Sequence, residues 1–396
     1  MRRGRVSQAG VFLSAVGVLL LTLVAPVHAI NVNAVWPDLG LPGFKLTPFF
    51  TERLEYQSNV LLAPRNELDD FISRSIPGVV VELPFGTHRL DLSARAEILR
   101  YLKHSQFDNE HFFLLGNLQL NFPGGLKVRM KEQFTTTSDP PGTELTGRIN
   151  RTTNTINPEV EYGLARRFSL RAGYTFTHVN FDEPVTRLSR NEHTFGLTGY
   201  WHMTAKSDLL GNLSYGKINF GNVTGRDSER FFGMVGLRGE LTSRLSSTFR
   251  FGYEHRESPT QKVNSIITSG DWTFVPSDRT RLILLTQRSL EESVFGTDTT
   301  FTATVATLLA QHSFGPKLTT NGRVFIGLNE YPNNDVDGAR FHRRTDVLMG
   351  LGLGADYQIQ RWLAVGADYS VSNRSSNFNG FDYTDHIIGM KVTLSI

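Results

Sequence analysis

The chain has 396 residues and no cysteine, which excludes disulfides, thiolate metal sites, a cysteine nucleophile and a lipid-modified cysteine anchor. It carries 41 basic and 38 acidic residues, but three of the arginines lie within the first five positions. If this start is removed, 41 less 3 leaves 38 basic residues against 38 acidic ones. The balanced charge gives no indication of a nucleic-acid partner.

Residues 1–29 are typical of a cleaved secretory signal. The three arginines precede an apolar run at 11–24, and Val27-His28-Ala29 resembles a cleavage site. A retained signal anchor is the alternative, but the apolar run is short for a membrane-spanning helix. Residues 30–43 contain prolines and glycines, and we expect them to form an unpaired periplasmic lead-in.

From Phe44 onward, segments with alternating polar and apolar residues recur about every twenty residues. Successive side chains of a strand point to opposite faces, so each segment predicts a strand with one apolar and one polar face. The eighteen predicted strands lie near 44–57, 70–84, 88–103, 110–121, 125–137, 147–164, 167–180, 190–204, 207–218, 229–243, 245–257, 263–276, 279–291, 300–313, 317–330, 342–358, 361–374 and 382–396.

The connections between these segments alternate between short and long. Two- to four-residue turns such as Ala205-Lys206 alternate with long polar stretches at 138–145, 182–190, 221–227, 291–299 and 331–341. Short periplasmic turns and longer outside loops are typical of outer-membrane barrels. An even strand number places both ends on the periplasmic side, so a miscount would give sixteen strands. A soluble periplasmic β protein is the alternative, but it has no reason to alternate so regularly.

The last segment indicates how the sheet closes. Lipid cannot satisfy an open sheet edge, so we expect this strand to pair with the first one. Residues 44–396 are therefore predicted to form an all-β, antiparallel, up-and-down transmembrane barrel in the bacterial outer membrane. Glu52 fits this pattern poorly, because it falls on the apolar face unless a bulge shifts the register. The apolar face of the closing strand comprises Ile388, Met390, Val392, Leu394 and Ile396.

A basic run provides the candidate pore wall. Lys127, Arg129 and Lys131 share one strand face, and Arg171 and Asp368 stand on the polar faces of their own segments. A lysine or arginine facing lipid near the membrane centre costs about 2–4 kcal/mol, which favours placing these charges inward. The run of Lys127, Arg129 and Lys131 is either a positive stretch of pore wall that selects anions or acidic sugars, or part of a salt-bridged wall. The possible acidic partners are Asp91, Glu97, Glu159 and Glu161.

Sequence motifs for metals and nucleotides are incomplete. Residues 333–338 match the first half of a calcium loop, but Arg344 stands where the bidentate glutamate is required. Gly350, Gly352 and Gly354 do not have the spacing of a nucleotide fingerprint, and small residues on an inward strand face explain them better. We expect neither a metal nor a cofactor.

Histidines near strand ends leave open an outer-membrane hydrolase with an active site at the rim. His178, His193 and His255 are the candidates, with Ser189 or Ser258 within reach along the chain. No motif supports such a pair, so we expect no enzymatic activity.

Glu55-Tyr56-Gln57-Ser58-Asn59-Val60, Asp69-Asp70-Phe71-Ile72 and Pro77-Gly78 resemble the opening of the putative β-barrel porin 2 family. The terminal Ile396 departs from the phenylalanine that ends many barrels but keeps its apolar character. Members of that family often belong to exopolysaccharide or capsule loci. The resemblance implies a porin-like channel for exopolysaccharide export, with outer-membrane lipid, the barrel assembly machinery, polysaccharide and export-complex proteins as partners. A general small-solute porin is the alternative within transport.

Overall fold

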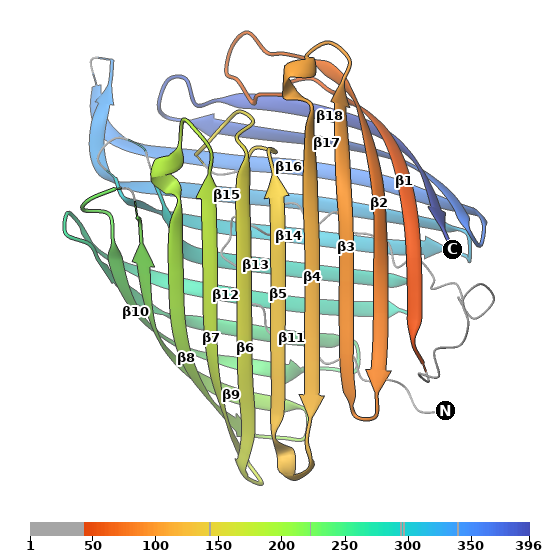
Figure 1. Ribbon diagram of the computed structural model, residues 1–396. Coiled ribbons are helices and arrows are strands. Elements are labelled where there is room, and N and C mark those ends of the chain that lie inside the picture. Colours follow the sequence, from red (N-terminus) through yellow and green to blue (C-terminus); the bar gives the residue numbers. More distant parts are fainter. Residues whose placement is uncertain (1–42, 142–143, 222, 294, 296–297, 339) are drawn as a thin grey trace.

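The computed structural model describes residues 43–141, 144–221, 223–293, 295, 298–338 and 340–396, so the expected signal segment and nearly all of the lead-in lie outside the described residues. The described chain forms one antiparallel sheet (Figure 1). Its strands are β1 (Lys45–Gln57), β2 (Asp70–Phe85), β3 (His88–Tyr101), β4 (Asn109–Asn121), β5 (Lys127–Thr137), β6 (Arg151–Ala165), β7 (Phe168–Phe181), β8 (Arg190–His202), β9 (Ser207–Asn219), β10 (Ser228–Glu240), β11 (Leu245–Glu257), β12 (Lys262–Ser277), β13 (Thr280–Glu292), β14 (Thr300–Phe314), β15 (Leu318–Asp337), β16 (Arg340–Gln360), β17 (Leu363–Ser376) and β18 (Tyr383–Ser395).

The sheet closes on itself through its first and last strands. Every strand pairs with its neighbours in the chain, and β1 also pairs with β18, from Phe49 opposite Ser395 to Gln57 opposite Ile387. Closure leaves no unpaired sheet edge. The predicted eighteen-stranded, up-and-down barrel is therefore confirmed. None of the described residues forms a helix that is long and apolar enough to cross a lipid bilayer.

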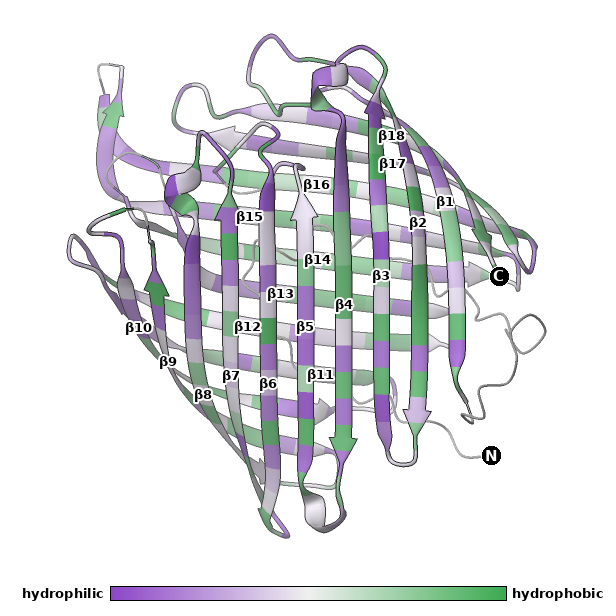
Figure 2. Ribbon diagram, viewed as in Figure 1, coloured by the Kyte–Doolittle hydropathy of each residue, from purple (hydrophilic) through white to green (hydrophobic). Residues whose placement is uncertain are grey.

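The two faces of each strand differ in polarity, and Figure 2 shows the alternation along the strands. Large apolar side chains are exposed on the outside, as the 69% exposure of Met390 illustrates. The alternate residues carry most of the charges, which pair with one another both within a strand and between strands. This arrangement suits lipid outside and water inside.

Glu52 lies on the outer face, and neither β1 pairing contains a register shift that would turn it inward. Ser73 and Ser75, on the same face of β2, donate hydrogen bonds to its two carboxylate oxygens, each at 2.6 Å. Glu52 therefore stays on the outer face, where two serines satisfy its carboxylate, and no bulge turns it inward.

Turns and loops alternate as the sequence predicts, and we call the end with the long loops extracellular. Most strand boundaries lie within three residues of the predicted ones, and two connections differ by more. The connection after β5 is longer than predicted, because β6 begins only at Arg151. The expected loop at 331–341 is instead mostly strand, since β15 and β16 continue to pair up to Asp337 opposite Arg340. This hairpin extends beyond the neighbouring strand ends (Figure 1, light blue).

Buried apolar residues gather in small clusters at the extracellular ends of the strands. One contains Val60, Ile72, Leu99 and Tyr101, and another contains Phe301, Ala303 and Tyr331. Loop residues pack against both clusters, Leu61 against the first and Phe295 against the second. The loops that carry Leu61 and Phe295 are thus held against the inside of the barrel mouth.

Candidate functional site at the barrel mouth

The loop at 138–150, which we call the crossing loop, is fixed at its start by buried polar contacts. Ser138 contacts Nε2 of His111 on β4 through its backbone N–H and its Oγ, each at 3.0 Å. The Asp139 carboxylate accepts a hydrogen bond from Arg148 at 2.7 Å and lies 3.6 Å from Arg74 on β2. These arginines hold the pKa of Asp139 well below its ordinary value despite its burial. The loop therefore leaves β5 turned toward the interior.

The crossing loop next contacts the wall at β1. Nη2 of Arg148 donates to Oε1 of Gln57 at 2.9 Å, and the backbone N–H of Gly147 donates to the carbonyl of Leu61 at 2.8 Å. Four strands separate β1 from β6, where the loop ends, so these contacts do not belong to a hairpin connecting adjacent strands.

The far point of the crossing loop is Glu144, which is 6% exposed. Its Oε2 accepts hydrogen bonds from Ser293 at 2.8 Å and from the Tyr331 hydroxyl at 3.2 Å, and its carbonyl accepts one from Arg374 at 3.2 Å. Tyr331 stands on β15, eight strands from β5 in one direction around the barrel and ten in the other. The loop thus spans the mouth nearly from wall to wall.

An arginine–aromatic cluster supports this far contact. Arg344 on β16 pairs with Asp346 at 2.6 Å, and both side chains are fully buried. The Arg344 guanidinium also lies 3.6 Å from the ring centroid of Phe381 and 4.6 Å from that of Phe295. Desolvated cation–π contacts of this kind are stabilising. They connect the loops at 293–299 and 377–382 to the wall that receives Glu144.

Asp298 links the loop at 293–299 to β15. Asn333 donates to its Oδ1 from the side-chain amide at 2.7 Å and from the backbone N–H at 3.3 Å. Burial, together with the nearby Asp335 and Glu144 carboxylates, raises the pKa of Asp298 to about 6, and the Asn333 hydrogen bonds oppose this shift.

We expect the attachment of this loop to weaken as the pH rises from about 4 to above 6. The docked loop favours protonated Asp298, so its stability is fully present below the ordinary pKa and is lost as Asp298 ionises. Limited proteolysis of the loop at pH 4 to 7 measures this change. Asp298→Asn should remove most of the pH dependence, and an unchanged pH profile in that variant would contradict the assignment.

The wall charges singled out in the sequence lie on the inner face and are mostly paired. Glu161 on β6 lies 3.4 Å from Lys127, 3.2 Å from Arg129 and 2.6 Å from Arg171. Asp368 pairs with Arg53 on β1 at 2.9 Å. Of the four proposed acidic partners, the structure places Glu161 beside the basic run and Glu159 beside Arg171 at 3.6 Å. Lys131 differs, because no carboxylate of the described residues lies within 4.0 Å of it.

This difference makes Lys131 the best test of a basic lumen. Lys131→Gln should shift the reversal potential toward cation selectivity more than Lys127→Gln does, because Glu161 already offsets the Lys127 charge. The shift should shrink from 0.1 M to 1 M salt, as the Debye length falls from about 10 Å to about 3 Å. Equal shifts of the reversal potential for the two variants in planar bilayers would contradict the interpretation that Lys131 contributes more to selectivity than Lys127.

Gly350 confirms the expectation of close approach on an inward strand face. The ring of Phe325 on β15 covers it so closely that an added Cβ would lie 2.1 Å from a ring carbon. The structure gives no support to a calcium-binding loop at 333–338, since these residues lie in the β15–β16 hairpin. Within the described parts of the chain, no group of three or more histidine, aspartate or glutamate side chains is arranged to hold a metal ion.

The histidines proposed for a hydrolase have partners other than the proposed serines. Nδ1 of His178 contacts Asn191 at 2.7 Å, that of His193 contacts the Tyr174 hydroxyl at 2.7 Å, and that of His255 contacts Asn264 at 2.7 Å. Ser189 is hydrogen-bonded to the backbone of Phe181, and Ser258 to the carbonyl of Gln261.

The structure instead brings His111 and Ser138 together, a pair that sequence proximity did not indicate. Asp139 lies 4.0 Å from Nδ1 of His111, so the three residue types match those of a catalytic triad. However, His111 is fully buried, and its Nε2 receives the backbone N–H of Ser138. This geometry holds the start of the crossing loop, and both side chains of the pair are buried.

Comparisons with known proteins give one family match and several similar solved structures. The family model described as Putative beta-barrel porin 2 matches residues 41–396. Among solved structures, the chain is similar to the outer membrane protein OpdK of Pseudomonas aeruginosa, with 13% identity, a TM-score of 0.46 and coverage of 89% of this chain and 99% of that one. It is also similar to OccK3 (OpdO) of the same organism (12% identity, TM-score 0.47, coverage 89% and 96%) and to OccAB3 of Acinetobacter baumannii (11%, 0.44, 89% and 99%). No curated protein sequence matches the chain significantly.

Proposed function

This chain belongs to the Putative beta-barrel porin 2 family and is a porin-like channel of the bacterial outer membrane, and on that premise we propose that it passes small hydrophilic solutes by diffusion. The crossing loop is the observation that carries this proposal. It runs from β5 to contacts with Ser293 and Tyr331 near the opposite wall, so the passage at the mouth is narrower than the barrel itself. A narrowed aqueous passage favours small solutes over polymers.

The inward wall supports passage of polar molecules. Its charges are arranged as cross-strand pairs, such as Arg74 with Glu97 at 2.7 Å and Lys391 with Asp356 at 2.8 Å. Paired charges keep the wall hydrated without a strong net field, which suits a channel of low charge selectivity.

Liposome swelling tests the size limit. Vesicles containing the protein should swell in solutions of monosaccharides and disaccharides and respond progressively less to longer oligosaccharides. Vesicles that do not swell in any sugar, together with no ion conductance in planar bilayers, would overturn the channel proposal.

Export of an exopolysaccharide is the second candidate. The family resemblance at Glu55–Val60 and Asp69–Ile72 favours it. A polymer would have to pass the crossing loop, so this use requires the loop to leave the mouth during export. Deletion of the gene should then abolish surface polysaccharide without reducing uptake of small sugars, whereas a diffusion channel predicts the reverse.

A hydrolase remains a distinct alternative for the same barrel. The buried His111–Ser138 pair is the arrangement that most resembles catalytic machinery among the described residues. We propose that it is structural, and that His111→Gln changes channel size rather than any esterase or lipase activity. Hydrolysis of an ester substrate that His111→Gln abolishes would establish the enzyme instead.

A further inference from the structure

The connections at the two ends of the barrel differ in charge. Between consecutive strands, the eight periplasmic turns contain seven lysines and arginines and one carboxylate, that of Asp278. The nine extracellular connections contain five lysines and arginines and ten carboxylates. The formal charges are therefore 7 − 1 = +6 at the periplasmic end and 5 − 10 = −5 at the extracellular end. A chain of nearly balanced charge thus presents a positive end to the periplasm.

The periplasmic cations form one row, which we call the basic rim. Each of the six successive periplasmic turns from β6–β7 to β16–β17 contributes at least one of them, and every one of these side chains is exposed. The row therefore follows most of the barrel's circumference. Its members are Arg166, Arg167, Lys206, Arg244, Arg279, Lys317 and Arg361.

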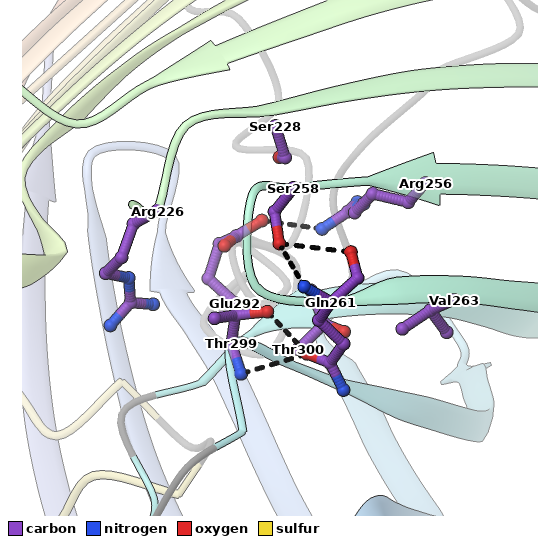
Figure 3. Close-up of a pocket in the computed structure, with 9 residues that line it drawn as sticks. All are labelled: Arg226, Ser228, Arg256, Ser258, Gln261, Val263, Glu292, Thr299 and Thr300. Carbon is purple, nitrogen blue, oxygen red and sulfur yellow. Dashed lines mark hydrogen bonds and ion pairs between the residues drawn. The ribbon is translucent and has the colours of Figure 1, made fainter. Parts of the chain in front are cut away.

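Carboxylates of the chain leave most of this charge unneutralised. Lys206 pairs with Glu240 at 2.6 Å, and no other member of the basic rim has a carboxylate of the described residues within 4.0 Å. At the extracellular end, by contrast, Arg256 pairs with Glu292 at 2.6 Å (Figure 3). The basic rim therefore holds positive charge that a partner outside the chain can neutralise.

The basic rim lies directly beside the lipid-facing surface. Phe168, which follows Arg167, is 51% exposed on the outer face, and Phe314, three residues before Lys317, is 59% exposed there. Aromatic side chains at strand ends are typical of the membrane interface, and long basic side chains extend from such positions toward the headgroups. The basic rim is therefore level with the headgroups of the periplasmic leaflet.

We infer that the basic rim binds anionic phospholipids of the periplasmic leaflet. Guanidinium groups bind phosphate oxygens with two hydrogen bonds, and each lysine or arginine close to an anionic lipid surface adds to the attraction. Anionic lipids carry a net charge that zwitterionic lipids lack, so the basic rim selects them. The short turns and their apolar outer neighbours favour a lipid over an acidic periplasmic protein as the occupant. This inference does not depend on the proposed channel function.

The tryptophans of the described chain provide a local probe, because each lies near one arginine of the basic rim. Trp201 is opposite Phe168, the neighbour of Arg167, and Trp362 directly follows Arg361. Trp272 lies three residues before Val275, whose N–H donates to the carbonyl of Arg244 at 2.8 Å. Bromine on a lipid tail quenches tryptophan fluorescence at short range, so quenching reports which lipid occupies this interface.

The experiment uses the purified full chain with Trp36→Phe, which removes the tryptophan outside the described residues. This parent chain is reconstituted in phosphatidylcholine vesicles that contain either brominated phosphatidylglycerol or brominated phosphatidylcholine. From the quenching, the anionic lipid should bind about fivefold more tightly than the zwitterionic one, as expected for one cation beside an anionic headgroup. The preference should shrink from 0.1 M to 1 M salt, because the Debye length falls from about 10 Å to about 3 Å.

A triple variant removes the charges beside the three tryptophans. Arg167→Gln, Arg244→Gln and Arg361→Gln together should bring the lipid preference close to one, whereas lysine at the same three positions should keep most of it. The matched control carries Arg65→Gln, Arg340→Gln and Arg343→Gln, which remove three exposed arginines at the extracellular end and should leave the preference unchanged.

A heat-dependent shift in gel mobility checks that each variant forms a barrel. If the glutamine triple variant does not fold, Arg361→Gln in a chain that keeps only Trp362 tests one position and should remove the preference seen there. Equal quenching by the two brominated lipids in the parent chain would overturn the proposal and favour an acidic protein as the partner. Equal losses in the periplasmic and extracellular triple variants would overturn it as well.

Discussion

Replacing Glu144 with alanine is expected to widen the channel mouth. The substitution removes the acceptor of the Ser293 and Tyr331 hydrogen bonds, which hold the far end of the crossing loop. Hydrogen bonds to a charged group contribute about 1.5–3 kcal/mol each, so losing two shifts the ratio of docked to released loop by about 10²–10⁴-fold. Single-channel conductance should rise, and liposomes should swell in oligosaccharides that the wild type excludes.

Glu183→Ala provides a matched control for this variant. Glu183 is an exposed glutamate of another extracellular loop, and no hydrogen bond or ion pair joins it to the described residues. The Glu183→Ala variant should have the same single-channel conductance as the wild type. If Glu144→Ala also conducts like the wild type, the crossing loop does not set the width of the passage.

A cross-link tests the same idea in the opposite direction. The chain has no cysteine, so Glu144→Cys combined with Ser293→Cys introduces the only two thiols. A short thiol-reactive cross-linker should return the enlarged conductance of this double variant toward the wild-type value. The same reagent applied to Glu144→Cys alone should not, because one thiol cannot fix the loop to the opposite wall.

The strands could be predicted from the sequence because each of them faces lipid on one side and water on the other. This imposes a period of two on nearly every segment, and the terminal run from Ile388 to Ile396 shows it most clearly. The prediction failed where that constraint ends. Beyond the barrel rim lipid no longer imposes this alternation, and residues 331–341 contain Pro332, Gly338 and several polar side chains. The sequence therefore predicts a loop there rather than paired strand.

The site was less accessible to sequence reasoning, because its contacts join residues far apart in the chain. The carbonyl of Glu144 meets a residue 230 positions away, Arg374, and its carboxylate meets Tyr331 at a separation of 187. Nothing local to residues 138–150 indicates these partners. The inward face of the basic run could be predicted, because it follows from the alternation of side chains along the strand. Which of the four candidate acids pairs with the run could not, since the choice of Glu161 depends on the strand register that places it opposite Lys127.

Deleting Leu394–Ile396 is expected to prevent stable insertion into the outer membrane. Leu394 pairs with both Phe50 and Leu363, so the closing strand is held on two sides to its end. Its last backbone bonds are those of Ser395 to the carbonyl of Trp362 at 3.0 Å and of Ile396 to that of Pro48 at 3.1 Å. Without them, backbone groups of β1 and of the start of β17 lose their partners, and an unpaired backbone group costs several kcal/mol wherever lipid replaces water.

Fractionation and gel mobility with and without heating measure the outcome. The truncated chain should be absent from the outer membrane and should not show the compact, heat-sensitive form of a closed barrel. Ser395→Ala is the control, since it keeps every backbone bond of the strand and should insert normally. Refolding of the purified truncated chain from urea into detergent separates lost recognition by the assembly machinery from lost closure. If the truncated chain forms a heat-sensitive barrel as readily as the wild type in both settings, pairing of these three residues is not what closes the sheet.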